Sequence, residues 1–421
     1  MKILIKNGRV IDPANDIDEI KDLYIDGAGI ARPFLDADMV IDAKGLWVAP
    51  GFIDLHVHLR EPGQEHKEDM QSGAKAAVKG GFTTICAMPN TTPKIDNVYW
   101  IEHTKKRSAE IGLCNILPIG AITKGFEGKD LTDFEAMKNA GMVAVSEDGM
   151  TVKNTILMSN ALKKAAELNL PVFVHCEDVD LVAGGVMHSG KTAEKLGLSG
   201  ISSDSEAHIV ARDIFYAEKT KAKLHICHIS TDDSLRVVRK AIKNKVNVTA
   251  EVCPHHFTLC DEDVAPHADP NFKMNPPLRN KTDVEAMKQG LKDGMISAIA
   301  TDHAPHHADE KAKGFADAPF GIVGLETALP LSLELVEQGI ISASELISKL
   351  STNPAKILGI DKGHLTVGAV ADITIIDSNA KYKIDAETFV SKSKNTPFDG
   401  RDVKGRVVCT IVNGRVVYDN R

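Results

Sequence analysis

Long apolar segments are missing from this 421-residue sequence, since no run reaches the roughly 18 consecutive apolar residues that a membrane-spanning helix needs. The first residues, Met1 to Lys6, also lack the apolar region of a secretory signal peptide. We therefore expect a protein that stays in the cytoplasm and has no membrane partner.

Cysteine pairs and blocks of basic residues are missing as well. The seven cysteines are scattered and form no C-x-x-C motif, which argues against disulfides and favours buried thiols in a reducing compartment. The 50 Lys and Arg residues face 58 Asp and Glu, for a net charge of −8, and they form no cluster. Because nucleic acids and anionic membranes are bound through such clusters, neither is an expected partner. The 43% hydrophobic and 26% charged residues are typical of a soluble globular protein.

The two ends of the chain have the pattern of β structure. Asn7-Gly8 and Asn413-Gly414 each lie between alternating apolar residues, which favours a hairpin because both turn positions need positive φ. Further short strands are expected at 22–30, 39–43, 372–376 and 406–411. We predict that residues 1–48 and 362–421 combine into one small β-sandwich domain.

Residues 49–361 alternate between short apolar runs and helical stretches, the pattern of a parallel sheet with crossover helices. About eight such units are present, the number that closes a (β/α)8 barrel. Strands are expected at 51–56, 83–88, 115–119, 142–146, 172–175, 223–228, 247–252 and 297–301, and helices at 67–79, 155–168, 204–219, 232–243 and 281–293.

Polar residues recur at or just past the carboxyl end of these strands, where a (β/α)8 barrel builds its active site. Polar residues with a purely structural role would have no reason to choose the same end each time. The residues at this end are His56, His58, Asn90, Asp148, His175, His228, His255, His256 and Asp302.

Several of these side chains suit a metal centre. His56 and His58 are two residues apart on a strand, so both imidazoles face the same side and can reach one cation. Imidazole and carboxylate groups bind Zn²⁺ and similar divalent ions. His175 and His228 each end a further strand. Asp302 follows the last strand, where it is either a helix cap or a ligand that also carries a proton.

The segments that contain these residues resemble a known family in the same order along the chain. Residues 54–63 (DLHVHLREPG) and 300–306 (ATDHAPH), with Lys311 following, resemble the two signature segments of the dihydroorotases, members of the amidohydrolase superfamily. The matching segments between them are Met88-Pro89-Asn90-Thr91, His175-Cys176-Glu177-Asp178, His228-Ile229-Ser230 and Asn275-Pro276-Pro277-Leu278-Arg279. The resemblance spans nearly the whole chain and includes the split β domain of the superfamily.

The resemblance implies a hydrolase that interconverts dihydroorotate and N-carbamoyl-L-aspartate in pyrimidine biosynthesis. It implies two Zn²⁺ ions per chain, one bound by His56, His58 and Asp302 and the other by His175 and His228. A metal-bound hydroxide would attack the ring carbonyl, and Asp302 would move its proton to the ring nitrogen as general base and acid. The residues implied to bind the substrate are Arg60, Asn90, Asn275 and His306.

The acid that bridges the two metals is left open between two neighbours. Many superfamily members use a carboxylated lysine after the fourth strand, but residues 143–149 contain no lysine. The type I dihydroorotases place an aspartate there, and Asp148 matches it. Glu147 stands where the family has another aspartate, and strand alternation sends only one of the two side chains to a given face. We expect Asp148 to be the bridging acid.

Three other histidines and one loop are expected to have roles outside the metal ligand set. His225 lies earlier in its strand and is assigned to packing, while His255 and His256 are expected to hydrogen-bond around the metal ligands. The charged segment 306–321 is either an ordinary solvated loop or a cover for the substrate.

Two other functions are compatible with the same residues. Hydantoinases, dihydropyrimidinases and allantoinases share the barrel and most metal histidines, but they usually have the bridging lysine, and their substrates lack the carboxylate that Arg60 would bind. A non-catalytic scaffold that supports aspartate transcarbamoylase is disfavoured because every expected ligand position is filled. A homodimer is expected as the commonest assembly, and association with aspartate transcarbamoylase is a further candidate interaction. The sequence does not choose among zinc, cobalt and manganese.

Overall fold

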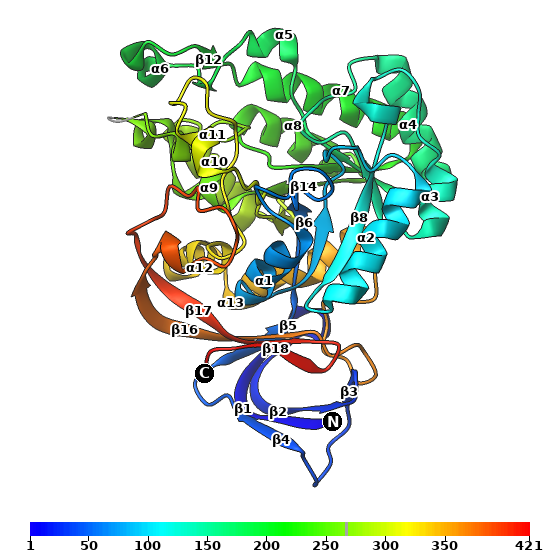
Figure 1. Ribbon diagram of the computed structural model, residues 1–421, viewed down its shortest axis with the longest axis vertical. Coiled ribbons are helices and arrows are strands. Elements are labelled where there is room, and N and C mark those ends of the chain that lie inside the picture. The colour runs from blue at the N-terminus through cyan, green and yellow to red at the C-terminus, as the bar shows by residue number, and fades with distance from the viewer. Residues whose placement is uncertain (266–267) are drawn as a thin grey trace.

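The computed structural model describes residues 1–265 and 268–421, and Figure 1 shows a barrel above a smaller β domain. Eight parallel strands form the barrel sheet in the order β15-β14-β13-β10-β9-β8-β7-β6. A parallel bridge between Val57 and His303 joins the two ends of this sheet, and the His58 amide donates to the His303 carbonyl at 2.9 Å. The predicted (β/α)8 barrel is confirmed.

The barrel strands fall where the apolar runs of the sequence place them. Each is buried along nearly its whole length, as strands covered on both faces must be. Their bounds are β6 (Phe52–Val57), β7 (Phe82–Ala87), β8 (Asn115–Ala121), β9 (Ala144–Ser146), β10 (Pro171–Val174), β13 (Lys223–Ile226), β14 (Val248–Val252) and β15 (Ala298–Ile299). The short pair β11 (Met187–His188) and β12 (Gly200–Ile201) forms a separate sheet.

Helices surround the barrel, and all five of the predicted ones are present. The helix predicted from residue 67 begins at Met70, because the Asp69 side chain caps it by accepting from the Ser72 amide at 2.7 Å. The longer helices are α1 (Met70–Lys79), α2 (Val98–Ile111), α3 (Phe134–Ala140), α4 (Thr155–Glu167), α7 (Asp204–Thr220), α8 (Asp232–Lys243), α10 (Lys281–Lys292) and α12 (Ala328–Glu337). Shorter ones are α5 (Val179–Val182), α6 (Lys191–Leu196), α9 (Pro254–Thr258), α11 (Ala308–Lys311), α13 (Ala343–Ile347) and α14 (Asn353–Leu358). Among the residues described, no helix combines the length and apolar character that crossing a bilayer requires.

The two ends of the chain share one mixed sheet with the order β18-β17-β16-β5-β1-β2-β3, and β4 also pairs with β1. The antiparallel pairing of β5 with β16 joins the N-terminal strands to the C-terminal ones. The bounds are β1 (Lys2–Asp12), β2 (Ile17–Asp26), β3 (Gly29–Ala31), β4 (Met39–Asp42), β5 (Trp47–Pro50), β16 (Ile373–Lys383), β17 (Asp402–Val412) and β18 (Arg415–Asp419). The domain limits 1–48 with 362–421, and 49–361, stay a prediction.

The two Asn-Gly pairs have different structures. Asn413 and Gly414, with φ of 49° and 70°, form the predicted hairpin turn between β17 and β18. The hairpin predicted at Asn7-Gly8 is wrong, because β1 runs straight through it with a β-bulge in its pairing to β2. A Cβ atom on Gly8 would lie 2.5 Å from Val48 Cγ2, so the glycine here allows β5 to pack closely against β1.

Candidate active site

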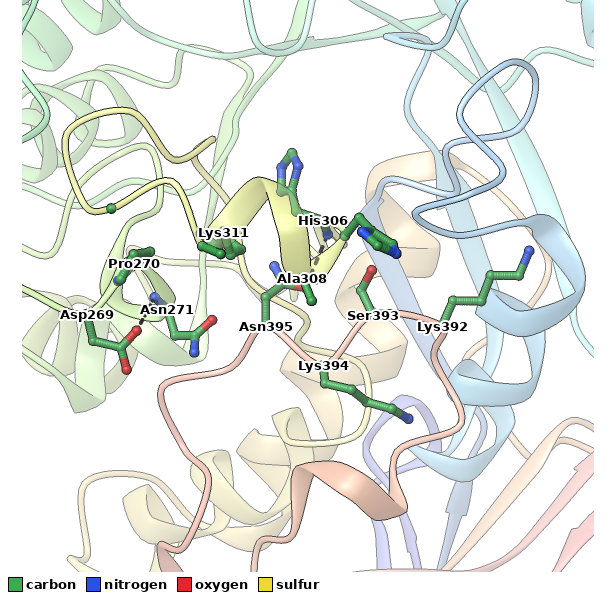
Figure 2. A pocket seen from close by; sticks show the side chains of 13 residues that line it. Asp269, Pro270, Asn271, His306, Ala308, Lys311, Lys392, Ser393, Lys394 and Asn395 are labelled. Carbon is green, nitrogen blue, oxygen red and sulfur yellow. Dashed lines mark hydrogen bonds between the residues drawn. The ribbon is translucent and has the colours of Figure 1, made fainter.

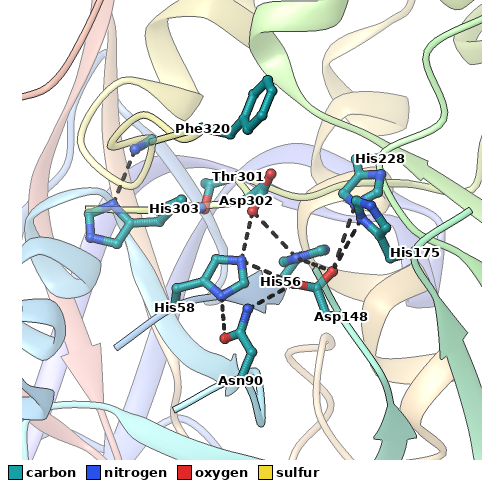
Figure 3. A network of polar contacts seen from close by, with 12 residues as sticks. His56, His58, Asn90, Asp148, His175, His228, Thr301, Asp302, His303 and Phe320 are labelled. Atoms are coloured by element: carbon teal, nitrogen blue, oxygen red, sulfur yellow. Dashed lines mark hydrogen bonds and ion pairs between the residues drawn. The ribbon is translucent and has the colours of Figure 1, made fainter. Parts of the chain in front are cut away.

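Six acidic and histidine side chains converge at one mouth of the barrel from strands that are far apart in sequence (Figure 3). All six lie at or just beyond the carboxyl end of a strand, and none is more than 7% exposed. They are His56 in β6, His58 after β6, Asp148 after β9, His175 after β10, His228 after β13 and Asp302 after β15. The structure therefore brings together all the residues that the sequence suggested as metal ligands.

Asp148 occupies the centre of this cluster. Its Oδ1 atom lies 3.2 Å from His56 Nε2, 3.7 Å from His228 Nε2 and 3.8 Å from His175 Nδ1. Its other oxygen, Oδ2, lies 3.4 Å from His58 Nε2. The same carboxylate thus belongs to two groups of potential ligands, one with His56 and His58 and the other with His175 and His228.

Asp302 lies beside the first of these groups. Its Oδ1 atom is 2.9 Å from His58 Nε2 and 3.4 Å from His56 Nε2. His56, His228 and Asp302 also form a group of their own, with ligand atoms within 4.8 Å of one another. Two cations could therefore be held side by side, and each would have imidazole and carboxylate ligands.

The donor atoms of the cluster fit a bound cation. Buried polar atoms nearly always have a hydrogen-bond partner. In the described part of the chain, however, His56 Nε2, Asp148 Oδ1 and His175 Nε2 are buried and make no well-directed hydrogen bond, only ion-pair contacts of 3.2 to 3.8 Å. These atoms belong to side chains that face one another, and imidazole nitrogens with carboxylate oxygens are the ligands that zinc and related divalent ions prefer.

The charges within the cluster support one another. Burial alone raises the pKa of the Asp148 carboxyl, but the charges of His56 and His58 outweigh it and hold that pKa well below its usual range. Burial lowers the pKa of His56, but Asp148 and Asp302 outweigh it and raise the pKa well above its usual value. The acids and the imidazole therefore stabilise each other's charged forms. A bound cation would replace a proton on the imidazole, because a histidine ligand must be neutral.

Glu147 points away from the cluster. Its carboxylate accepts from the Thr123 amide at 2.9 Å and from the Thr123 hydroxyl. Asp148, one residue further, faces the histidines and accepts from Asn90 Nδ2 at 3.3 Å. The two neighbouring acids, which both follow the end of β9, thus have separate surroundings.

A buried network behind His56 fixes its ring, and its central residue was not identified from the sequence. Glu251 Oε1 lies 3.0 Å from His56 Nδ1, and Glu251 Oε2 lies 2.9 Å from His225 Nε2. A proton on His56 Nδ1 bonds to Glu251 and leaves Nε2 facing Asp148 and Asp302, free to bind a cation. The signal for Glu251 in the sequence is an acid inside the buried strand β14, where an unpaired charge would be costly.

His225 does more than the packing that we expected. Its ring does pack against Phe173, with 4.6 Å between ring centroids. Both of its nitrogens also hydrogen-bond, since Nδ1 lies 2.8 Å from Thr249 Oγ1 and Nε2 contacts Glu251. His225 therefore holds in place the carboxylate that orients His56.

The paired histidines of α9 lie outside the six-residue cluster. His255 and His256 form a separate buried group with Cys253. His256 Nε2 lies 3.0 Å from the Pro276 carbonyl. Pro276 directly follows Asn275, one of the predicted substrate-binding residues. His256 therefore supports that part of the chain, whereas we had expected it to hydrogen-bond to a metal ligand.

The backbone at three candidate residues is in the left-handed region. Arg60, His228 and Asp302 have φ of 61°, 31° and 48°, which is unfavourable for residues with a side chain. Such strain persists where surrounding contacts enforce it, and it is concentrated at functional sites. The residue before Asp302 is fixed in this way, because Asp54 accepts from the Thr301 amide and hydroxyl at 3.1 and 2.6 Å.

A cavity of about 200 Å³ opens directly above the cluster. Its lining includes all four residues predicted to bind substrate, together with Phe320 and Gly321 at the end of segment 306–321. Gly149 and Ala304 also line it, and neither was predicted as a site residue. The full lining is His58, Arg60, Asn90, Asp148, Gly149, His175, His228, Asn275, Asp302, Ala304, His306, Phe320 and Gly321.

Arg60 gives this cavity a positive charge. Burial lowers the pKa of Arg60 to about 10, so the guanidinium stays charged at neutral pH. Its Nε donates to the Pro305 carbonyl at 3.1 Å, and Nη2 lies 3.2 Å from His306 Nε2. In the described parts of the chain no carboxylate lies within 4.0 Å of it. The cavity can therefore receive an anion.

Comparisons with known proteins agree with this geometry. The family described as "Dihydro-orotase-like" matches residues 45–234. A dihydroorotase of Pelobacter propionicus is 49% identical over 425 residues, covering 99% of this chain and 100% of its own. A dihydroorotase of Bacillus cytotoxicus is 49% identical over 422 residues, covering 99% and 98%.

Solved structures share the fold over the whole chain. An L-hydantoinase from Arthrobacter aurescens has a TM-score of 0.88 at 25% identity and covers 99% of this chain and 96% of its own. A dihydropyrimidinase from Brevibacillus agri has a TM-score of 0.86 at 24% identity and covers 100% and 95%. The hydantoinases thus share the architecture at about half the sequence identity of the dihydroorotases. Full-length identity near 49% decides between the two, and the chain belongs to the dihydroorotase family.

Proposed function

We propose that this dihydroorotase hydrolyses the cyclic amide of dihydroorotate at a pair of zinc ions and releases N-carbamoyl-L-aspartate in a reversible step of pyrimidine biosynthesis. The observation that carries the proposal is the position of Asp148, whose carboxylate is shared by two groups of histidines. A shared carboxylate is the arrangement that holds two cations close enough to act on one water molecule.

The ligands divide between the two ions according to their contacts. His56, His58 and Asp302 would hold one zinc ion, His175 and His228 would hold the other, and Asp148 would bridge them. Bound zinc would lower the pKa of a water molecule and polarise the amide carbonyl. Glu251 would keep His56 Nε2 directed at the first ion.

Asp302 would move the proton in this reaction. Its Oδ1 faces His56 and His58, while the residue also lines the cavity in which the substrate would lie. One carboxylate oxygen can therefore bind metal while the other takes a proton from the attacking water and gives it to the ring nitrogen as the C–N bond breaks.

The substrate carboxylate would be held by polar side chains that line the same cavity. Arg60 supplies a charge with no carboxylate against it, and Asn90, Asn275 and His306 line the same cavity. Burial and the Arg60 charge lower the pKa of His306. The ring is therefore neutral and can hydrogen-bond to the substrate in that form. A charge-assisted bond from arginine favours a substrate with a carboxylate over hydantoin or allantoin, which have none.

Zinc titration of the metal-free protein tests this proposal directly. Chelator-treated protein should show no turnover of dihydroorotate, and activity should return as zinc is added, reaching its plateau at two ions per chain. Hydantoin and allantoin, tested in parallel, should be poor substrates. Full activity without metal, or faster turnover of hydantoin than of dihydroorotate, would contradict the proposal.

Arg60→Lys is expected to raise the KM for dihydroorotate about tenfold while changing metal content little. Lysine keeps the charge but loses the planar fork that contacts a carboxylate through two parallel hydrogen bonds. Steady-state kinetics and metal analysis of the purified variant measure the two quantities. A lysine variant with the parental KM would remove Arg60 from substrate binding.

The location and assembly of the protein stay predictions. We expect a cytoplasmic homodimer, and association with aspartate transcarbamoylase is a further candidate interaction. The intact ligand set and the named relatives favour an enzyme over a scaffold that has lost its site.

A further inference from the structure

A short C-terminal segment, residues 391–395 (SKSKN), lies against the active-site loops and lines a neighbouring pocket, although it contributes no side chain to the substrate cavity. Its side chains alternate: Ser391, Ser393 and Asn395 are buried, whereas Lys392 and Lys394 are more exposed. Figure 2 shows this segment passing beside α11, with Asn395 close to His306. The buried positions are all polar, so each must have hydrogen-bond partners.

The first part of segment 391–395 contacts the loop between β6 and α1. The Ser391 hydroxyl donates to Glu68, and the Lys392 amide donates to the same carboxylate at 3.3 Å. Ser393 donates to the Lys67 carbonyl at 2.7 Å. This loop also contains His58 and Arg60, so the segment supports one side of the active site.

Asn395 contacts the loop on the other side, which follows β15. Its Oδ1 accepts from the His306 amide at 3.2 Å, and its Nδ2 donates to the Ala304 and Gly321 carbonyls at 3.2 and 3.0 Å. Its own carbonyl accepts from the Val323 amide at 2.9 Å. Asn395 is 5% exposed, and both polar atoms of its amide group are used. One side chain therefore joins the beginning and the end of residues 304–323.

A second contact fixes residues 304–323 from the opposite side. The buried Lys311 ammonium donates to the Lys273 and Pro319 carbonyls at 3.1 and 3.0 Å. The Gly321 amide donates to the same Lys273 carbonyl at 3.0 Å. Since Asn275 lies two residues after Lys273, these bonds connect two walls of the substrate cavity.

We propose that Asn395 is a positioning residue for substrate binding, which holds residues 304–323 as a preformed wall of the pocket and thereby places His306. The inference rests on the proposed role of His306 in binding the substrate. Neither of the two expectations for residues 306–321 describes this arrangement, because the segment is bonded at its base and through Lys311, unlike a free loop or a hinged cover. Preformed contacts reduce the ordering cost of binding, so their loss should appear mainly in KM.

Asn395→Ala and Asn395→Asp test the proposal. The aspartate variant keeps the size of the side chain and so protects the fold, but it loses both donated bonds and turns an oxygen toward two carbonyls. For both variants we expect the KM for dihydroorotate to rise about tenfold, which is the size of effect expected when a binding group is misplaced. The value of kcat should change less than about threefold, because the catalytic groups keep their positions. Both metal ions should stay bound. Hydrogen exchange of the amides in 304–323 should become faster.

Asn353→Ala is the matched control. Asn353 is a partly buried asparagine whose Nδ2, like that of Asn395, donates to a backbone carbonyl, here that of Ser297 at 2.8 Å. Ser297 precedes β15 and thus lies at the other end of the barrel. Its loss should lower stability without changing KM or exchange in 304–323. An unchanged KM in both Asn395 variants, or an equal rise in Asn353→Ala, would overturn the inference.

His306→Ala separates this inference from the proposed function. If His306→Ala raises KM and the Asn395 variants do not, the role of Asn395 is wrong and the proposed substrate site stands. If His306→Ala leaves KM unchanged, the proposed role of His306 fails, and the positioning role of Asn395 fails with it.

Discussion

Asp302→Asn should bind nearly as much metal as the parent protein and turn over dihydroorotate at least about a hundredfold more slowly, the scale of a lost general acid–base group. Asparagine keeps an oxygen in the position of Oδ1, which contacts His56 and His58. It cannot take a proton from water and deliver it to the ring nitrogen. Metal analysis and kcat at saturating substrate measure the two effects separately.

The reverse reaction gives an independent check on Asp302. Ring closure of N-carbamoyl-L-aspartate needs the same proton movement in the opposite direction, so both directions should slow by the same factor. An asparagine variant with near-parental kcat in either direction would remove Asp302 from proton transfer. A variant that has lost its metal would instead make Asp302 mainly a ligand.

Asp148→Asn should weaken metal binding by more than about a hundredfold, beyond the usual cost of altering a residue that only supports a ligand. The substitution removes one negative charge from the centre of both ligand groups, since Asp148 lies within 3.8 Å of nitrogens from His56, His175 and His228. Activity at limiting zinc should fall in parallel. Zinc titration followed by metal counting measures this loss.

Glu147→Gln is the matched control, because it makes the same chemical change one residue away. Glu147 contacts Thr123 and not the histidines, so this variant should keep both metals and lose only about 1 kcal/mol of folding free energy. Metal loss in Glu147→Gln with retention in Asp148→Asn would show that the neighbouring acids have been assigned the wrong way round.

The sequence predicts the barrel and its metal cluster well because both follow from local patterns. Short apolar runs that alternate with helices place all eight strands within a few residues of their observed bounds. His175 and His228 could be identified because each follows such a run, and the carboxyl ends of parallel strands meet at one mouth.

Residues whose role depends on distant partners could not be predicted in this way. Glu251 and His225 become meaningful only when β6, β13 and β14 are adjacent. Asn395 lies 89 residues beyond the His306 amide that it binds, and nothing in the local sequence SKSKN indicates the contact. Asp148 was preferred to Glu147 mainly because of the family resemblance, since both acids follow β9 and only the assembled barrel shows which one faces the histidines.

The two Asn-Gly pairs show the limit of local patterns most clearly. Both have the same residues and the same alternating surroundings, yet only Asn413-Gly414 forms a hairpin. At Asn7 the amide donates to Asp22 and the side chain donates to Asp42, and the packing of Val48 against Gly8 keeps the strand continuous. Contacts with other strands therefore override the turn preference.

The bonds from Asn395 also limit how far the molecule can be dissected. Because β5 pairs with β16, a chain cut after residue 361 would lose three of the eight strands of the terminal sheet. It would equally lose the only side chain in the described residues that joins Ala304, His306 and Gly321. The catalytic barrel is thus not a self-sufficient module to be excised or grafted, because its substrate pocket depends on a segment that follows the barrel in the sequence.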